Sequence, residues 1–369
     1  MKTKCLSIVS RGLERIAGQE IKEICKVDAV QKSGCVAFEV GDIKELCRFS
    51  YLTQSCDRVL LLLDEFEFSE NPFEKIKDSL EKKPLPEGAY KVLSIRRGIH
   101  SFNSDDVMRN VGTCLNQLGK EIDLRNPDNL LVVFIRDSTC CVGLDLAQLD
   151  LHKREYRIFT SPSDIRGTIA YAMVRFSGFK EGDILLDPFC NSGTIVIEAA
   201  LYATKRSPRF YEKAKLKNCK IDFEKIDSKI KKSESKITAV DANHRNVVAT
   251  KKNSKIAGIV KDIDFSRSDV EWMDIKFEKG SIDRIVTKLP AIRKEGNREK
   301  MLKILDEFFY NGEYVLGDNG KMAIMTENIE DLKPLVEKHH FVIKEEIKVD
   351  MGKEEKHIYI IEKSSSGKQ

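Results

Sequence analysis

The stretch Asp187-Pro188-Phe189-Cys190-Asn191-Ser192-Gly193-Thr194 decides the fold, because it joins a predicted buried strand to a predicted helix. The strand is the apolar run Ile184-Leu185-Leu186, and the helix is expected over residues 194–203. A loop of this kind turns backbone N–H groups and a helix N-terminus toward a bound ligand. Asn191 and Gly193 suit it because both residue types tolerate left-handed backbone angles.

Two acidic residues follow the next predicted strands. Asp241 comes directly after the apolar run 237–240, and Asp269 follows the segment 263–268. An acid at the end of the second strand of such a sheet lies where ribose hydroxyls usually bind. An acid after the third strand could contact an adenine amino group. Each acid alone is more often a turn or cap residue, but together they favour a nucleoside cofactor.

From residue 161 onward, predicted strands alternate with predicted helices, which is typical of a parallel α/β sheet. The last two strands are expected to form a closing hairpin. Beyond the elements already named, the pattern predicts a helix over 243–257, strands at 285–286 and 320–325, a helix over 300–309, and the hairpin strands 341–349 and 357–362.

The chain before residue 150 has a different, α+β texture. A strand is predicted over Tyr90–Arg97, and a helix follows with Ser104 or Asp105 as its N-cap. Two further strands, 130–135 and 140–144, flank a turn. The pattern therefore indicates a separate small module ahead of the α/β sheet.

Composition favours an ordinary globular protein, with 41% hydrophobic and 33% charged residues. No run approaches the roughly 18 apolar residues that span a membrane, and the N-terminal apolar stretch is too short for a signal peptide. A cytoplasmic location without membrane contact is expected. The 10 cysteines form no CxxC pair, so we expect reduced thiols that act as small hydrophobes, and no metal site.

Residues 203–236 are strongly basic, with 12 Lys or Arg against 5 Asp or Glu, although the whole chain has a net charge of only +4. A solvated insertion is the ordinary interpretation of such a segment. An RNA-facing strip becomes competitive where other features indicate nucleic acid.

Those features are motifs that resemble a known family. Residues 90–150 resemble the THUMP domain, chiefly in Gly98-Ile99-His100-Ser101-Phe102-Asn103-Ser104 and Ile122-Asp123-Leu124-Arg125-Asn126-Pro127-Asp128. Residues 150–363 resemble the methyltransferase domain of THUMP-containing guanine-N2 methyltransferases of tRNA and rRNA. The motifs that carry this second resemblance are His152-Lys153-Arg154-Glu155-Tyr156-Arg157, Ile165-Arg166-Gly167-Thr168, the 187–194 loop and Ile197-Glu198-Ala199-Ala200.

The resemblance implies an α/β fold in which a class I, Rossmann-like methyltransferase domain follows an α+β ferredoxin-like/THUMP region. The implied domains are a ferredoxin-like region at 1–60, a THUMP RNA-binding domain at 61–150 and the methyltransferase domain at 151–369. The implied methyl donor is S-adenosyl-L-methionine (SAM), and the implied partner is tRNA or another structured RNA. We expect a monomer.

Site residues follow from the same resemblance. Residues that match the family's SAM-binding positions are Arg166, Thr168, Asp187, Asn191, Gly193, Asp241 and Asp269, although the family usually has Gly where Asn191 stands. Residues expected to contact RNA are Arg96, Arg97, Lys205, Arg206 and Arg209.

The catalytic loop departs from the family pattern, which is Asn-Pro-Pro-Tyr or a relative such as Asn-Leu-Pro-Phe. Here the motif position reads Lys288-Leu289-Pro290-Ala291. Attack by a guanine amino group needs an acceptor for its protons, and an ammonium only donates. The aromatic ring would stack on a flipped base, which Ala291 cannot do.

Three interpretations stay open. The leading one is methyl transfer from SAM to structured RNA, at guanine N2 in tRNA. The second is a catalytically weakened paralogue that binds RNA and SAM as an accessory protein. The third is a methyltransferase with a changed target base.

Overall fold

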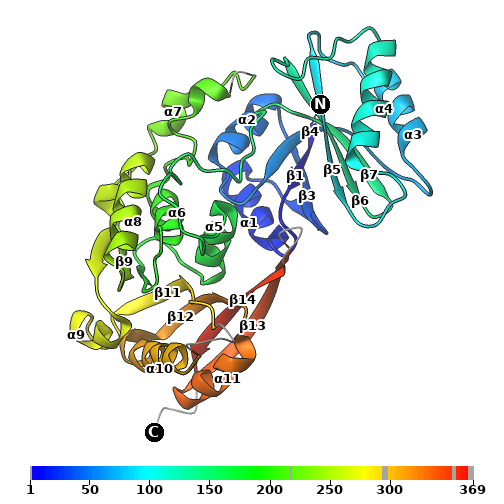
Figure 1. Cartoon of the computed structure of the whole chain (residues 1–369). Helices are drawn as coiled ribbons and strands as arrows, with labels where there is room; N and C mark the ends of the chain where they lie inside the picture. Colours follow the sequence, from blue (N-terminus) through cyan, green and yellow to red (C-terminus); the bar gives the residue numbers. More distant parts are fainter. Residues whose placement is uncertain (1, 217, 293–297, 351–354, 365–369) are drawn as a thin grey trace. The chain divides into compact units, whose positions relative to one another are not determined.

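The computed structural model describes residues 2–216, 218–292, 298–350 and 355–364. The chain divides into two compact units. The N-terminal unit comprises Met1–Val9, Ala17–Leu151 and Tyr211–Phe223, and the C-terminal unit comprises Ser10–Ile16, His152–Phe210 and Glu224–Gln369. Within the described residues, each unit is built on one seven-stranded sheet (Figure 1).

The sheet of the N-terminal unit is continuous, in the order β2-β3-β1-β4-β7-β6-β5. Strand β4 joins its halves, because Leu61 pairs with Cys5 of β1 on one side and with Leu144 of β7 on the other. The division expected between residues 60 and 61 therefore falls inside a strand, and the two predicted regions share one sheet. The strands are β1 (Thr3–Ile8), β2 (Ala29–Lys32), β3 (Cys35–Val40), β4 (Arg58–Glu67), β5 (Tyr90–Arg97), β6 (Asn129–Arg136) and β7 (Thr139–Asp145).

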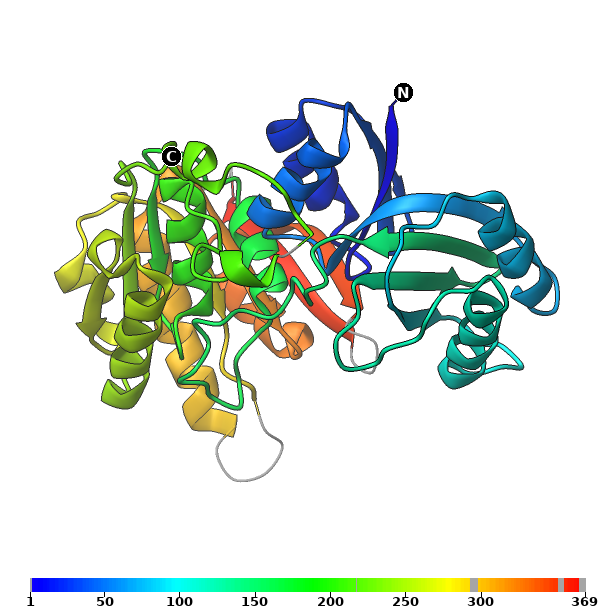
Figure 2. The ribbon, with the colours of Figure 1, turned by 90° about the horizontal axis from the view of Figure 1, so that it is seen from above.

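Two helices cover one face of β5, β6 and β7. The ribbon of the two helices lies against these strands in Figure 2. Apolar side chains of α3 and α4, among them Ile76 and Val111, pack with Tyr90, Val133 and Val142 into one core. The helices of this part of the chain are α1 (Glu14–Cys25), α2 (Ile43–Leu52), α3 (Phe73–Lys82) and α4 (Ser104–Gln117).

The N-cap of α4 corrects a prediction. Asn103, rather than Ser104 or Asp105, caps the helix, because its side chain accepts from the backbone N–H groups of Asp105 and Asp106. The Asp106 carboxylate in turn accepts from the backbone N–H of Asn103, which completes a capping box.

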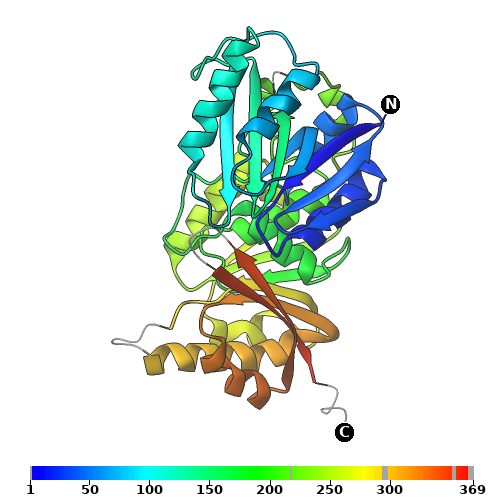
Figure 3. The same cartoon turned by 90° about the vertical axis from the view of Figure 1, so that its right-hand side faces the viewer.

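The sheet of the C-terminal unit has the order β10-β9-β8-β11-β12-β14-β13. Strands β8 to β12 pair in parallel, and β14 lies antiparallel between β12 and β13 at one side of the sheet (Figure 3). The strands are β8 (Ile184–Asp187), β9 (Lys236–Asp241), β10 (Asp264–Arg267), β11 (Ile282–Lys288), β12 (Leu316–Thr326), β13 (Phe341–Asp350) and β14 (Glu355–Lys363). The closing hairpin is thus confirmed, while residues 351–354 between its strands lie outside the described residues.

Helices cover both faces of this sheet, as the predicted alternation requires. Helices α5, α6 and α8 lie on one face and α10 and α11 on the other (Figure 1). Side chains of each group pack with the strands into a core. The helices are α5 (Gly167–Phe176), α6 (Thr194–Thr204), α7 (Phe223–Asp227), α8 (His244–Ala257), α9 (Met273–Lys276), α10 (Arg298–Val315) and α11 (Ile329–Lys338), with short 3-10 turns at Lys213–Lys215, Val260–Asp262 and Val270–Trp272.

The strand order places the functional loops. Strand β8 lies between β9 and β11, so the chain leaves β8 and β9 at the edge where an open parallel sheet binds its ligands. In the part of the chain that the structure describes, no helix is both long and apolar enough to cross a membrane. All 10 cysteines are free thiols, most of them buried.

Candidate active site

The loop after β8 depends on two left-handed residues. Asn191 has φ 49° and Gly193 has φ 84°. A Cβ on Gly193 would lie 2.4 Å from Cγ2 of Thr250, so a side chain at this position would be both strained and obstructed. Asn tolerates the left-handed region, which explains why the loop keeps its shape with Asn191 in the usual glycine position.

Asp187 lies at the base of this loop and is buried, 1% exposed. Its Oδ1 accepts from the Thr287 hydroxyl at 2.6 Å and from the backbone N–H of Phe189 at 3.3 Å. Burial raises the pKa of Asp187 to about 7, and the Thr287 hydrogen bond opposes that rise. The carboxyl group thus ties the loop to β11.

Asp241 ends β9 and organises the neighbouring wall. Its Oδ2 accepts from the backbone N–H of Asn191 at 3.1 Å and from Nδ2 of Asn246 at 3.0 Å. Its Oδ1 accepts from the backbone N–H of Asn243 at 2.8 Å. Asn246 was not among the predicted site residues. It could have been predicted from its position, because it lies in the first turn of the helix that follows Asp241.

The other predicted cofactor residues lie at the start of α5 and at the start of a 3-10 turn. Asp269 follows β10 and accepts from the backbone N–H of Val270, so it caps a short 3-10 turn. Arg166 is the half-buried N-cap residue of α5. Thr168, in the first turn of α5, is fully buried. The cofactor roles of these three residues stay predictions.

One buried hydroxyl group of the loop is available to a polar ligand. Oγ1 of Thr194, like that of Thr168 in α5, has no hydrogen-bond partner among the described residues. Because buried hydroxyl groups are normally satisfied, the Thr194 hydroxyl indicates that a ligand atom completes the loop. Thr194 also lines a small hollow with Asp187 and Asn191. Polar groups of these kinds would hold the ammonium and the carboxylate at the amino-acid end of SAM.

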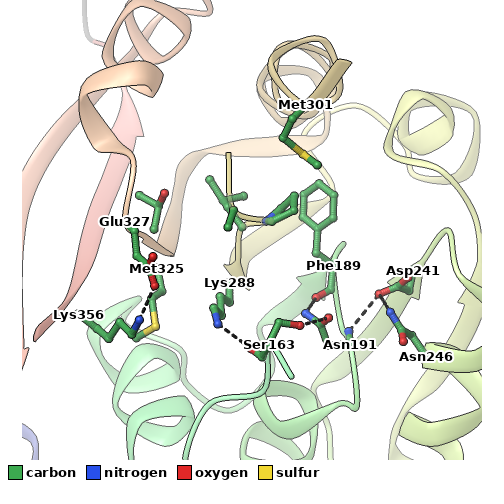
Figure 4. Close-up of a pocket in the computed structure, with 14 residues that line it drawn as sticks. Ser163, Phe189, Asn191, Asp241, Asn246, Lys288, Met301, Met325, Glu327 and Lys356 are labelled. Atoms are coloured by element: carbon green, nitrogen blue, oxygen red, sulfur yellow. Dashed lines mark hydrogen bonds and ion pairs between the residues drawn. The ribbon is translucent and has the colours of Figure 1, made fainter. Parts of the chain in front are cut away.

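A cavity of about 600 Å³ begins at this wall (Figure 4). Figure 4 shows Asp241, Asn246 and Asn191 on one side of it and Glu327 and Lys356 on the other, with Lys288 between them. Its described lining residues are Ser163, Phe189, Asn191, Asp241, Asn246, Lys288, Leu289, Pro290, Ala291, Met301, Met325, Thr326, Glu327 and Lys356. Arg166, Thr168 and Asp269 are not among them.

The catalytic-motif residues Lys288, Leu289 and Pro290 all line this cavity. Nζ of Lys288 donates to the backbone oxygen of Ser163 at 2.7 Å, and the Ser163 hydroxyl donates to Oδ1 of Asn191 at 2.8 Å. Two of the residues that depart from the family pattern, Lys288 and Asn191, therefore both contact Ser163. Leu289 is buried, and its N–H donates to the backbone oxygen of Met325 at 3.0 Å.

An ion pair at the far wall was not foreseen from the sequence. Glu327 directly follows β12 and pairs with Lys356 of β14. The hydrogen bond from Lys356 holds the pKa of Glu327 below its ordinary value, and Lys288 lowers it further, against the effect of burial. The available signal was an acid immediately after a strand of the parallel sheet, the same signal that identified Asp241.

The residues expected to contact RNA have varied surroundings. In the N-terminal unit, Nη1 of Arg96 lies 3.0 Å from Nδ1 of His100, and Nη1 of Arg97 donates to the backbone oxygen of Gly34 at 3.1 Å. The Arg97 guanidinium also stacks 5.4 Å from the ring centre of Phe134. Both arginines are half-buried, so less of each side chain is exposed to RNA than their charge in the sequence suggested.

The basic segment is divided between the units. Lys205 and Arg206 belong to the C-terminal unit, whereas Lys213 and Lys215 belong to the N-terminal unit. Arg209, which was also expected to contact RNA, is only 2% exposed, so its guanidinium is not presented at the surface. A long arginine side chain can be buried where polar partners meet its guanidinium, and a count of charges along the sequence does not reveal this.

The fold and two sequence matches identify the family of this chain. A parallel sheet with a strand–loop–helix turn after its first strand, and with one reversed strand between its fifth and sixth strands, has the class I methyltransferase fold. Residues 154–357, more than half of the chain, match the family of the RMKL-like methyltransferase domain, and residues 72–145 match the THUMP domain. The chain belongs to the RMKL-like methyltransferase-domain family.

Relatives agree with this assignment. The tRNA (guanine(6)-N2)-methyltransferase of Methanocaldococcus jannaschii is 26% identical over 93% of this chain and 96% of that protein. The crystal structure of TrmN from Thermus thermophilus has a TM-score of 0.73 at 21% identity, over 98% of this chain and 99% of that one. A further protein, solved in complex with SAH, has a TM-score of 0.74 at 17% identity, over 99% of this chain and 98% of that one. The predicted class, a SAM-dependent methyltransferase with a THUMP domain, is confirmed.

Proposed function

We propose that this protein transfers the methyl group of SAM to N2 of a guanine in tRNA, as a cytoplasmic monomer. The observation that carries the proposal is the cavity that joins the Asp241 wall to the Leu289-Pro290 loop. One wall carries the residues expected to bind the methyl donor. The other carries the catalytic-motif residues, which are expected to bind the base that accepts the methyl group. The name of the Methanocaldococcus jannaschii relative supports guanine N2 as the acceptor.

The cavity suits a base that has left its stack. Its volume of about 600 Å³ lies within the range of ordinary ligand pockets. An enzyme that modifies a base must extrude it into such a pocket, where apolar side chains flank its faces and polar groups meet its edge. Phe189, Met301 and Pro290 supply the apolar lining, and Glu327 and Lys356 supply the polar edge.

RNA recognition is proposed for the THUMP domain together with the exposed part of the basic segment. Lys205 ends α6 and is exposed, and the guanidinium of Arg206 stacks 4.2 Å from the ring centre of Phe210. Both belong to the C-terminal unit, near the end of a helix whose N-terminus faces the cofactor loop. Phosphate contacts from such residues would position tRNA without reading its sequence.

Methyl transfer to unmodified tRNA transcripts tests the proposal. Purified protein with isotope-labelled SAM should produce N2-methylguanosine, identified by mass spectrometry of the digested nucleosides. Asp241→Ala should abolish the product because it removes the acceptor for Asn191 and Asn246, whereas the matched change Asp264→Ala, at an exposed acid of β10, should not. Label found only in another nucleoside would support a changed target base instead.

A weakened, RNA-binding paralogue is the second candidate, and one contact favours it. Lys288 donates to Ser163 at the motif position where an acceptor is expected. This candidate predicts that the protein binds SAH and tRNA normally and methylates no nucleoside. The same assay, run beside calorimetry with SAH, separates the two functions.

A further inference from the structure

We propose that Glu327 reads the Watson–Crick edge of the target base and accepts its amino protons, in place of the motif oxygen that Lys288 cannot supply. The inference rests on the proposed function and names the residue that selects guanine. Nothing in the family motif points to this position, which lies beyond the catalytic loop on another strand.

Strand register brings Glu327 to the catalytic loop. Lys288 of β11 pairs with Met325 of β12, and Leu289 continues the pairing by donating to the backbone oxygen of Met325. Glu327 is two residues beyond Met325, so it leaves the sheet at the same edge as Pro290. Both residues line the same cavity (Figure 4).

The electrostatic surroundings keep Glu327 charged and in place. The Glu327 side chain is 53% exposed, whereas that of its partner Lys356 is 17% exposed. Lys356 and Lys288 both lower the pKa of Glu327, so the carboxylate is ionised at neutral pH and can only accept hydrogen bonds. The negative charge also offsets the Lys288 ammonium, which would otherwise oppose a positively charged methyl donor.

This group matches guanine and not adenine. Guanine presents two adjacent donors, N1–H and N2–H, beside the acceptor O6, and a carboxylate can accept from both donors at once. Lys356 and Lys288 line the same cavity and supply ammonium donors for O6. Adenine presents the lone pair of N1 at the middle of the same edge, where a carboxylate repels it. A site whose polar groups pair with the donors of one base discriminates against a base that leaves them unpaired.

The same contact supports the chemical step. The lone pair of guanine N2 forms a bond to the methyl carbon, and the carbon–sulfur bond breaks with its electrons passing to sulfur. The nitrogen must then lose one of its two protons. The Glu327 carboxylate, already hydrogen-bonded to that N–H, takes the proton and releases it to water, so that the products are the methylated base, SAH and one proton.

Nucleotide binding tests base recognition without requiring turnover. Guanosine and adenosine 5′-monophosphates are titrated by NMR saturation transfer into protein saturated with SAH. Wild type should prefer the guanosine nucleotide by about tenfold or more, because a hydrogen bond to a charged group is at stake. Glu327→Gln should remove that preference. Glu330→Gln, the same change at an exposed glutamate three residues further along, should retain it.

Rates of methyl transfer to tRNA test the proton acceptor. Glu327→Gln should lower kcat by roughly 10²–10⁴-fold, as expected for loss of one general base. Its affinity for SAH should stay within about twofold of wild type, because Glu327 lies across the cavity from Asp241.

Failures of the inference and of the proposed function are distinguishable. Equal binding of the two nucleotides by wild type, no detectable binding of either, or an unchanged preference in Glu327→Gln overturns the inference. A guanine preference that disappears in Glu327→Gln, in a protein that methylates no tRNA, supports the inference and refutes the proposed function. A normal kcat in Glu327→Gln refutes the proton-acceptor role.

Discussion

The two walls of the cavity differ in the features that determine their structure: backbone geometry in one and side-chain chemistry in the other. The cofactor wall, defined by the 187–194 loop and Asp241, keeps its shape through backbone geometry: left-handed residues, N–H groups and a buried carboxyl. The catalytic wall, defined by residues 288–291 with Glu327 and Lys356, depends on which side-chain atoms donate or accept. Backbone geometry tolerates few substitutions, whereas an acceptor oxygen can come from another strand. The second wall therefore carries the departures that change its chemistry, at Lys288 and Ala291, whereas Asn191 on the cofactor wall keeps the left-handed turn.

The largest expected effect concerns the buried carboxyl of the cofactor wall. The pKa of Asp187 is about 7 in the folded protein against an ordinary value of 3.8, so between these pH values the folded protein holds a proton that the unfolded chain has released. The contribution of Asp187 to stability is therefore greatest below about pH 4, falls as pH rises to about 7 and is constant above. The fall is at most about 4 kcal/mol.

Denaturant unfolding of wild type and Asp187→Asn from pH 4 to pH 8 measures this effect. The free energy of unfolding of wild type should decline relative to that of the variant across that range. Parallel curves for the two proteins would mean that Asp187 is ionised throughout, and that the hydrogen bond from Thr287 outweighs burial.

A glycine substitution tests whether backbone geometry holds the cofactor wall. Gly193→Ala combines a φ of 84° with a Cβ 2.4 Å from Thr250, while Gly178→Ala has a φ of 76° and nothing within 4 Å. The Gly178 change should cost about 1–2 kcal/mol of stability from strain alone. Gly193→Ala should cost more and should weaken SAH binding, measured by calorimetry. Equal losses in both variants would remove the argument from close packing at Thr250.

A ring added to the catalytic wall tests the opposite property, tolerance of side-chain change. Ala291 is exposed, so tyrosine fits there and can stack on the target base. Stacking of an aromatic ring on a base contributes about 1–3 kcal/mol, so Ala291→Tyr should lower the KM for tRNA by about tenfold. Ala291→Leu, which adds bulk without a ring, should not do so. An equal gain with leucine would indicate hydrophobic filling rather than stacking.

The smallest expected effect lies outside both walls, on the basic segment. Reversing Lys205 and Arg206 to glutamate should reduce the slope of log affinity for tRNA against log salt by about one unit for each phosphate interaction that the change removes. Filter binding at several salt concentrations measures the slope. A slope that does not change would make the segment a solvated insertion that does not touch the RNA.

The strand, turn and helix around the cofactor loop were predicted correctly, because the conformational preferences of neighbouring residues determine them. The strand before Asp187, the left-handed turn through Asn191 and Gly193, and the acid that ends β9 all follow from neighbouring residues. Strand β5 matched its predicted bounds for the same reason. The N-cap of α4 was misplaced by one residue, since Asn103, Ser104 and Asp105 are all good capping types.

Contacts between segments that are distant in the sequence could not be predicted in this way. A strand pattern does not state its partners, so the pattern of β4 could not show that it joins β1 to β7 in one sheet. The burial of Arg209 depends in the same way on what surrounds it rather than on its charge.

By itself, the sequence determined a class I methyltransferase fold, a THUMP domain and the cofactor loop, because each rests on residues close together in the chain. Only the tertiary structure decided what faces the catalytic loop. Glu327 follows β12, Lys356 lies on the neighbouring strand β14, and Lys288 lies about 40 residues earlier in the chain than Glu327. Their proximity is set by strand order and register, which depend on the packing of the whole sheet.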